Sequence, residues 1–159
     1  MMSYELKYPD VWRGEFLVRG QRAPMKLNYV GGNINIAVSA LPKSKSNPHI
    51  KISQQVTPGR FPTFKTKKAC LLTATPFGRT PKEKMDQVRI LKRTFGKYIK
   101  TKDSAIGMAA LISNEPEKTP YKAYVITPSE VTSRLIVRYA PDWYYSICDQ
   151  MHFLVIISL

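Results

Sequence analysis

The 159-residue sequence predicts a single α+β domain, residues 1–159, in which an antiparallel β-sheet packs against one main basic amphipathic helix. Three observations predict this class. Short apolar segments bounded by Gly and Pro recur along the chain, as strands do. One longer segment, residues 81–100, has helical periodicity instead. A hydrophobic content of 43% is typical of globular chains, and the length suits one core.

The first part of the chain predicts β-structure. The segment "GEFLVRG" (14–20) is a short strand closed by glycines. The segments "MKLNYV" (25–30) and "NINIAVSA" (33–40) flank Gly31-Gly32, which predicts a hairpin with a two-residue turn. In the second arm apolar and mostly polar positions alternate, as in a half-buried strand. A further strand is predicted in "HIKISQQV" (49–56).

The stretch "CLLTATPFGR" (70–79) contains "LTATP", which looks like a strand-end motif of superfamily 2 helicases. A helicase also needs a phosphate-binding loop of the form G-x-x-x-x-G-K-[ST] and an acidic Mg²⁺-binding motif. The sequence contains neither. We therefore interpret the stretch as a β-strand that ends at Pro76, since a proline favours an extended conformation in the residue before it.

A helix is predicted from residue 81 to about residue 100. Thr80 is a suitable N-cap, Pro81 suits the first helical position, and Glu83 completes a capping box. The predicted apolar stripe consists of Met85, Val88, Leu91, Phe95, Tyr98 and Ile99. The opposite face consists of Lys82, Asp86, Arg89, Arg93, Lys97 and Lys100.

The last third of the chain contains one ambiguous segment and three predicted strands. "SAIGMAALIS" (104–113) suits a short second helix, but its periodicity fits a strand as well. Strands are predicted at 121–127, 133–140 and 151–159. Because the sequence given stops within an apolar strand, we expect this strand to be held in a sheet or a subunit contact.

Charge is the strongest functional signal. The net charge is +14, and residues 60–102 contain 13 Lys or Arg against two acids, so this window supplies 13 − 2 = +11. Such clustering predicts a surface for a polyanion, either nucleic acid or an anionic membrane, although a merely solubilising surface is the alternative. In the 57–68 loop, basic residues alternate with Phe61 and Phe64, a pattern that can hold phosphates and stack bases. The predicted polyanion-binding residues are Arg60, Lys65, Lys67, Lys68, Lys82, Arg89, Lys92, Arg93, Lys97 and Lys100.

No pattern in the sequence predicts an enzyme, a cofactor or a metal site. The two histidines, His49 and His152, are too few for a histidine-only zinc site, and there is no C-x-x-C pair. Cys70 and Cys148 are expected to be buried free thiols in a reducing compartment, with a single disulfide as the alternative. The N-terminal residues contain no apolar signal-peptide region, and no apolar run is long enough to span a membrane, which predicts a soluble or peripheral protein.

The segment "QVRILKRTFGKYIKTKDSAIGMAALI" (87–112), a basic amphipathic helix followed by an apolar stretch, and the order of elements resemble the matrix proteins of rhabdoviruses, especially the small ones from plants. This resemblance implies a non-enzymatic structural protein that self-associates, binds and condenses ribonucleoprotein, and contacts anionic membrane during virion assembly. It further implies a homo-oligomer, a nucleocapsid protein as partner, and a location in the virion and the host cytoplasm or nucleus. The sequence departs from the family pattern in lacking a long lysine-rich N-terminal arm and a P-P-x-Y motif.

Three alternatives stay open, and composition alone does not separate one of them, a ribosome-associated or general host RNA-binding protein, from the first of the two described next. The chain fits a nucleic-acid-binding protein that binds RNA without forming a shell. In that case no sequence-specific readout is predicted, since neither an RNP-type strand motif nor a GXXG loop is present. A jelly-roll capsid protein also fits the many short strands, but the central helix and the missing basic N-terminal arm count against it.

Overall fold

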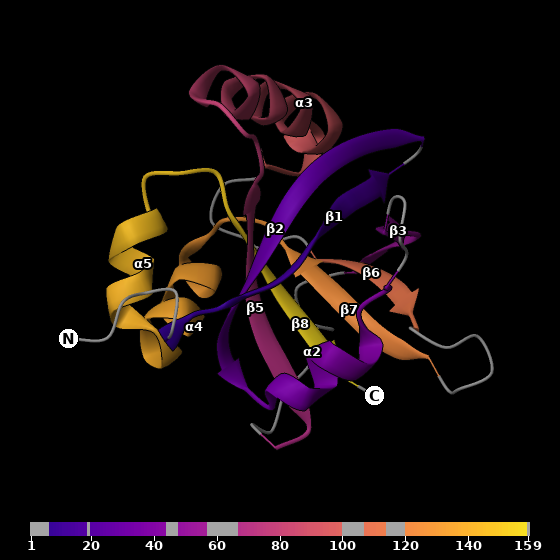
Figure 1. Cartoon of the computed structure of the whole chain (residues 1–159), viewed down its shortest axis with the longest axis vertical. Helices are drawn as coiled ribbons and strands as arrows, with labels where there is room; N and C mark the ends of the chain where they lie inside the picture. The colour runs from indigo at the N-terminus through magenta and orange to yellow at the C-terminus, as the bar shows by residue number, and fades with distance from the viewer. Residues whose placement is uncertain are drawn as a thin grey trace.

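The chain folds around one curled β-sheet whose two edge strands follow each other in the sequence (Figure 1). The computed structural model describes residues 7–18, 20–43, 48–56, 67–99, 107–113 and 120–158. In these ranges eight strands form a single sheet in the order β3-β1-β2-β5-β8-β7-β6-β4. Only Ser53 separates β3 (His49–Ile52) from β4 (Gln54–Val56), although they lie at opposite edges. The sheet therefore curls until its edges approach each other, which protects both from pairing with another chain.

The other six strands lie between these edges. Their bounds are β1 (Asp10–Val18), β2 (Gln21–Gly32), β5 (Ala69–Pro76), β6 (Gly107–Ile112), β7 (Tyr121–Ile126) and β8 (Phe153–Ser158). Neighbouring strands run antiparallel except β1 and β3, which are parallel. The predicted α+β class is thus confirmed, with one parallel pair in a sheet that was predicted to be antiparallel.

The inner face of the curled sheet holds the larger hydrophobic core. Two helices add side chains to it: α2 (Ile34–Ala40) contributes Ala37 and Ala40, and α3 (Pro81–Ile99) contributes Leu91. Figure 1 shows α3 and α2 near opposite ends of the sheet. The largest fully buried side chains of this core are Phe16, Met25, Leu27, Ile50, Leu72, Leu91 and Phe153.

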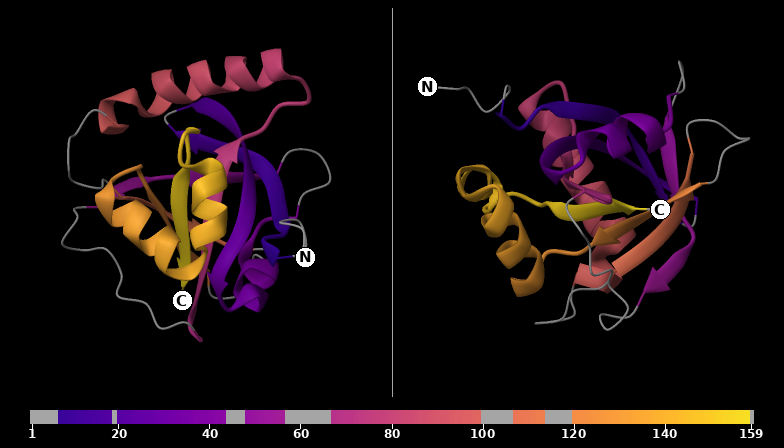
Figure 2. Two further views of the ribbon diagram at one scale, coloured as in Figure 1. Left: turned by 90° about the vertical axis from the view of Figure 1, so that its left-hand side faces the viewer. Right: turned by 90° about the horizontal axis from the view of Figure 1, so that it is seen from below.

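A second, smaller core lies on the outer face of β5, β7 and β8, where α4 (Glu130–Tyr139) and α5 (Pro141–Ile147) cover the sheet (Figure 2). Leu71 of β5, Leu154 and Ile156 of β8, and Ile136 of α4 are fully buried there or nearly so. Strand β5 consequently has apolar layers on both faces, and all eight of its residues are buried. This explains why its sequence is apolar without a clear alternation.

The hairpin predicted over residues 25–40 is wrong, because residues 34–40 form the helix α2 and not a second strand. Gly32 ends β2 with φ +82° in the left-handed region, which turns the chain away from the sheet. The Asn33 side chain then accepts a hydrogen bond from the Asn35 N–H at 3.0 Å and caps the helix. The apolar spacing also fits a helix, since Ala37 and Ala40 lie three residues apart on the buried side.

The strand predicted over residues 133–140 is also wrong, since residues 133–139 belong to α4 and Ala140 is its C-cap. Ser129 caps this helix by accepting a hydrogen bond from the Thr132 N–H at 3.2 Å, and Arg134 pairs with Glu130 one turn away. In the described part of the ambiguous segment, residues 107–113, the chain forms the strand β6 (Gly107–Ile112) and not the second helix. The strands predicted at 14–20, 49–56, 121–127 and 151–159 are confirmed within one to four residues, except that Ser53 divides the second into β3 and β4. The helix predicted at 81–100 is confirmed as α3.

Candidate nucleic-acid interface

The "LTATP" motif lies in the middle of the sheet and has a structural role. It is the second half of β5, which pairs with β2 on one side and β8 on the other. The Thr73 hydroxyl accepts a hydrogen bond from Trp143 Nε1 at 2.9 Å, and Thr75 is also buried. The interpretation as a strand that ends at Pro76 is confirmed. Because this strand is buried in the sheet, it fixes the position of the turn and of α3, which follow it in the chain.

The turn after β5 is held to the sheet before α3 begins. The Phe77 N–H donates to the Pro24 carbonyl at 3.3 Å. The Arg13 guanidinium lies over the Phe77 ring, 4.7 Å from its centroid, and also pairs with Asp10 at 2.5 Å. This cation–π contact spans two elements and restricts the turn. Arg13 thus contacts the turn that precedes α3. The sequence does not predict this role, because Arg13 stands within a strand and no local pattern links it to Phe77.

The helix α3 begins with the predicted cap. The Thr80 hydroxyl accepts a hydrogen bond from the Glu83 N–H at 3.1 Å, and the Thr80 carbonyl accepts one from the Lys84 N–H at 2.9 Å. The first six residues of α3 are nonetheless all exposed, whereas Leu91 is fully buried. The N-terminal part of the helix therefore projects beyond the sheet, and the middle anchors it. Met85, predicted for the apolar stripe, is 60% exposed because none of the described residues packs over it closely enough to bury it.

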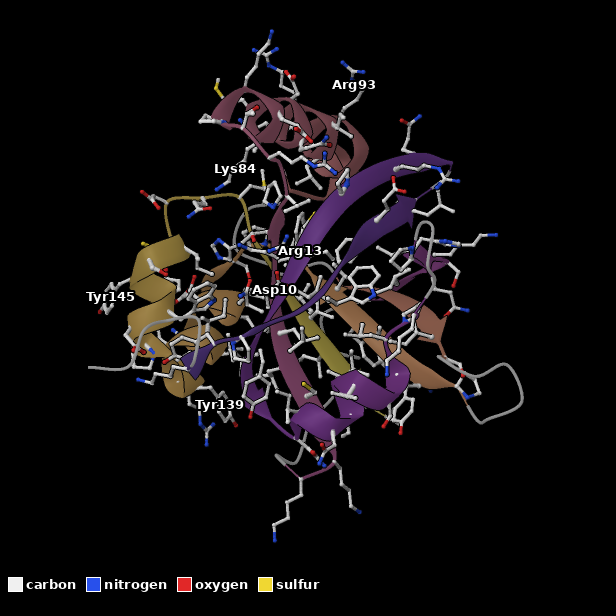
Figure 3. The ribbon with its side chains drawn as sticks, in the orientation of Figure 1. Asp10, Arg13, Lys84, Arg93, Tyr139 and Tyr145 are labelled. Atoms are coloured by element: carbon white, nitrogen blue, oxygen red, sulfur yellow. The ribbon has the colours of Figure 1, made fainter. Side chains whose placement is uncertain are left out.

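The outer face of α3 presents cations to solvent. Lys82, Arg89 and Arg93 are exposed, and Figure 3 shows Arg93 pointing away from the body of the protein. Arg89 lies 3.7 Å from Asp86, but both side chains are more than half exposed, so the pair is weak. No carboxylate in the described part of the chain pairs with Lys82, Lys92 or Arg93. Their positive charge is therefore available to an external anion.

The predicted polyanion-binding residues fall into separate groups. Lys82, Arg89, Lys92 and Arg93 share α3. Lys67 and Lys68 are exposed at the start of β5, whereas α3 follows its end. With eight residues in β5 and about 3.3 Å per residue, the strand that separates the two groups is roughly 26 Å long. Arg60, Lys65 and Lys100 lie outside the described residues, as does the side chain of Lys97.

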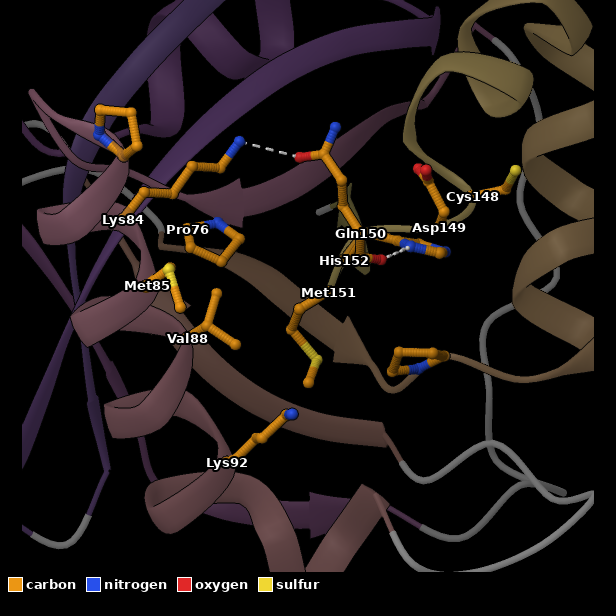
Figure 4. Close-up of a pocket in the computed structure, with 12 residues that line it drawn as sticks. Pro76, Lys84, Met85, Val88, Lys92, Cys148, Asp149, Gln150, Met151 and His152 are labelled. Carbon is orange, nitrogen blue, oxygen red and sulfur yellow. Dashed lines mark hydrogen bonds between the residues drawn. The ribbon is translucent and has the colours of Figure 1, made fainter.

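A groove runs beside the cationic face of α3 (Figure 4). One wall is the helical face that carries Lys84, Met85, Val88 and Lys92, and the other is the α5–β8 connection, residues 148–152. The Lys84 ammonium reaches across and donates to Gln150 Oε1 at 3.1 Å. The cavity volume is about 700 Å³. Sequence reasoning missed this groove, because its two walls are more than 50 residues apart in the chain.

The cysteines differ from what the sequence predicts. Both are free thiols, but only Cys70 is buried, whereas Cys148 is exposed beside the groove. Burial raises the pKa of the Cys70 thiol to about 12, so it stays protonated near neutral pH. The expectation of a buried Cys148 is wrong because residue 148 follows the end of α5 at the surface.

The ring of His152 is buried and held by its own loop. Its Nδ1 donates to the Gln150 carbonyl at 2.9 Å, since a carbonyl oxygen can only accept. Across the described residues, no group of three or more His, Cys, Asp or Glu side chains is placed to hold a metal ion. None of the helices in the same ranges has the length and apolar content to cross a membrane.

Comparison with known proteins changes the family assignment. No protein-family profile matches the chain. Msx2-interacting protein from mouse and from human is 31% identical over 169 aligned positions, which cover 99% of this chain and 4% of each relative. Protein split ends from Drosophila melanogaster is 26% identical over 165 positions, covering 96% of this chain and 3% of the relative. The chain is similar to one segment of these animal proteins.

Similarity to Msx2-interacting protein and split ends overturns the resemblance to rhabdovirus matrix proteins. That resemblance depended on element order and on residues 87–112, whereas these alignments extend over nearly the whole chain. The viral matrix assignment and the virion association are therefore wrong, and the nucleocapsid protein as a partner has no support. Nothing in the structure or the comparisons supports a homo-oligomer. The alternative of a nucleic-acid-binding protein fits these findings better than a viral matrix protein does.

Proposed function

We propose that this chain is a non-enzymatic binding module that holds nucleic acid, with RNA as the expected polyanion, on the outer face of α3. One observation supports it above the others: Lys82 and Arg93 project into solvent with no carboxylate from the described residues to compensate them. Arg89 and Arg93 are spaced i,i+4 and lie on the same face of the helix. Each guanidinium can hold a phosphate through two parallel hydrogen bonds.

The proposed contacts read the backbone and not the bases. Lysine and arginine contacts to phosphate position a nucleic acid without reporting its sequence. Binding should therefore tolerate many sequences and weaken steeply with salt. For three to five phosphate contacts with a single strand, log K should fall by about 2 to 3.5 for each unit of log salt concentration.

The test is fluorescence anisotropy with a labelled 20-nucleotide single-stranded RNA between 50 and 200 mM salt. The double variant Arg89→Glu/Arg93→Glu should weaken binding at least about tenfold at low salt and flatten its salt dependence. The control is Arg134→Glu/Arg138→Glu, which makes the same charge change at the same spacing on α4. Equal RNA affinity of the wild type and both double variants would refute the proposed function.

Docking of a protein partner is a second candidate function. The mammalian relatives are named for an interaction with Msx2, and a role of that kind is a proposal for this chain, which spans only 4% of their length. The groove beside α3 favours it, because a hollow with an apolar wall is a common binding feature for protein side chains.

A further inference from the structure

The groove between α3 and residues 148–152 is lined in part by a buried acceptor that has no hydrogen-bond partner. The side chain of His152 is one of the lining residues, and the residue is only 5% exposed. Because its Nδ1 donates to the Gln150 carbonyl, its Nε2 carries a lone pair and accepts. None of the described residues offers a donor to this nitrogen. A buried polar atom left unpaired costs free energy, and an N–H group of a ligand would remove that cost.

The apolar walls of the groove suit a flat aromatic ring. Met85 and Val88 lie on the helical wall and Met151 on the opposite one, and Figure 4 shows the three side chains turned into the same space. Thioether sulfurs make favourable contacts with aromatic rings, and methionine side chains are flexible enough to close on one from both sides. The volume of about 700 Å³ falls within the range of roughly 300–1,000 Å³ that is typical of small-molecule sites. A single heteroaromatic ring therefore fits the groove.

Two lysines of the helical wall are placed to hold phosphates on either side of such a ring. Lys84 and Lys92 lie about two turns apart on α3, which is roughly 12 Å along the helix axis. Lys84 donates to a neutral amide oxygen of Gln150 and so keeps its charge, and Lys92 pairs with no carboxylate of the described residues. Asp149, on the opposite wall, is the one acidic lining residue, which leaves the lining with a net charge of 2 − 1 = +1.

From this geometry we infer that the groove holds an unpaired nucleobase of single-stranded RNA. The ring lies between Met85 and Met151, an N–H on its edge donates to His152 Nε2, and the flanking phosphates lie near the two lysines. All four bases carry an N–H on the pairing edge, so the groove selects an unpaired base and not one sequence. In a duplex the same edge is paired and the faces of the base are stacked, which excludes it from the groove.

This inference rests on the proposed function and adds to it the class of RNA. Contacts on the outer face of α3 reach phosphates only, and phosphates are present in single strands and duplexes alike. The groove adds one base contact that only a single strand can make. A strand without bases therefore separates the two sites, because it keeps every phosphate contact and loses the base contact.

The chain offers matched variants that leave its charge unchanged. Val88→Trp fills the groove with a side chain of the protein itself, and Val88 is only half-buried. Val38→Trp makes the same replacement on α2, at an exposed residue that does not line the groove. Met85→Ala removes one wall contact at an exposed helical position, so it does not disturb the core. His152→Phe keeps a ring at the position and removes the acceptor.

The test is fluorescence anisotropy with three labelled probes: a 20-nucleotide oligouridine, an abasic strand of the same length and backbone, and a 20-base-pair RNA duplex. We expect the wild type to bind oligouridine at least about fivefold more tightly than the abasic strand. Val88→Trp should remove that advantage and change the affinity for the abasic strand and the duplex by less than about twofold. Met85→Ala and His152→Phe should each weaken oligouridine binding alone, and Val38→Trp should change nothing.

Equal affinity of the wild type for oligouridine and the abasic strand would overturn the inference, and so would equal effects of Val88→Trp and Val38→Trp on oligouridine. Arg89→Glu/Arg93→Glu distinguishes this failure from that of the proposed function. If this double variant weakens all three probes while the groove variants alter none, the outer face of α3 holds RNA by itself. The proposed function then stands, and the groove is left to the protein partner of the second candidate function. If the wild type binds none of the probes, the proposed function fails and the inference fails with it.

Discussion

Trp143 of α5 donates a hydrogen bond from its indole Nε1 to the hydroxyl of Thr73 in β5, at 2.9 Å and across 70 residues of sequence. Thr73 is fully buried, and the indole covers the outer face of the sheet. A threonine in the middle of an apolar strand is thus explained by its partner on the helix. The same bond fixes α5, and α5 leads directly into the wall of the groove.

Thr73→Val should destabilise the protein by about 1 kcal/mol, because valine keeps the shape of threonine but removes this acceptor. Trp143→Phe removes the donor and also loses packing area, so its cost should be larger. Chemical denaturation of both single variants and the double variant provides a coupling energy, expected to be about 1 kcal/mol. A coupling energy near zero would show that the bond contributes nothing to stability.

Acid should weaken the attachment of the N-terminal segment to α5. Hydrogen bonds from Lys7, and then from Tyr8, lower the pKa of Asp142 to about 2. Because the folded-state pKa lies below the usual value near 3.9, the stability that Asp142 contributes is present above about pH 4 and is lost as the pH falls through about 2. Denaturation at pH 2 to 6 should show this loss in the wild type. Asp142→Asn should reduce it, whereas Asp149→Asn, at an exposed position, should leave it unchanged.

The two thiols should react at very different rates. Cys148 is exposed, whereas Cys70 is fully buried and its pKa is raised to about 12. Since the thiolate is the reactive form, a chromogenic disulfide reagent should titrate one thiol in the native protein and two in denaturant. Cys148→Ser should leave no fast-reacting thiol. Rapid native reaction of that variant would contradict the burial of Cys70.

Two glycines allow backbone strain to be separated from steric overlap. Gly20 and Gly32 have nearly the same φ, +80° and +82°. An added Cβ meets nothing within 4 Å at Gly20, but it would lie 2.3 Å from the Ala69 carbonyl oxygen at Gly32. Gly20→Ala should therefore cost about 1 kcal/mol, the cost of the left-handed conformation alone. Gly32→Ala should lower the free energy of unfolding clearly more than Gly20→Ala does. Equal losses in the two variants would show that the backbone around Gly32 moves to relieve the overlap.

Local sequence signals explain which secondary-structure predictions are confirmed and which are wrong. The helix α3 was predictable because Thr80, Pro81 and Glu83 act within a few residues of each other. The helices α2 and α4 were predicted as strands because their Ile and Val residues favour β-structure. Capping by Asn33 and Ser129 outweighs that preference, and both caps are visible in the sequence. In both segments the cap prevails over the strand propensity of the side chains, because it determines where a helix can begin.

The α+β class, the basic helix with its cap, the strand that ends at Pro76 and the positive charge of α3 could all be predicted from the sequence. These properties depend on residue type and on neighbours within a few positions. Three features depend on how distant segments pack: the sheet curls, Lys67 and Lys68 lie at the other end of β5 from α3, and residues 148–152 face Lys84 to Lys92. The groove exists because β8 pairs antiparallel with β5. This pairing brings the segment that follows β5 and the segment that precedes β8 to the same end of the sheet. Strand pairing between distant segments is set by packing of the whole core, and no local pattern encodes it.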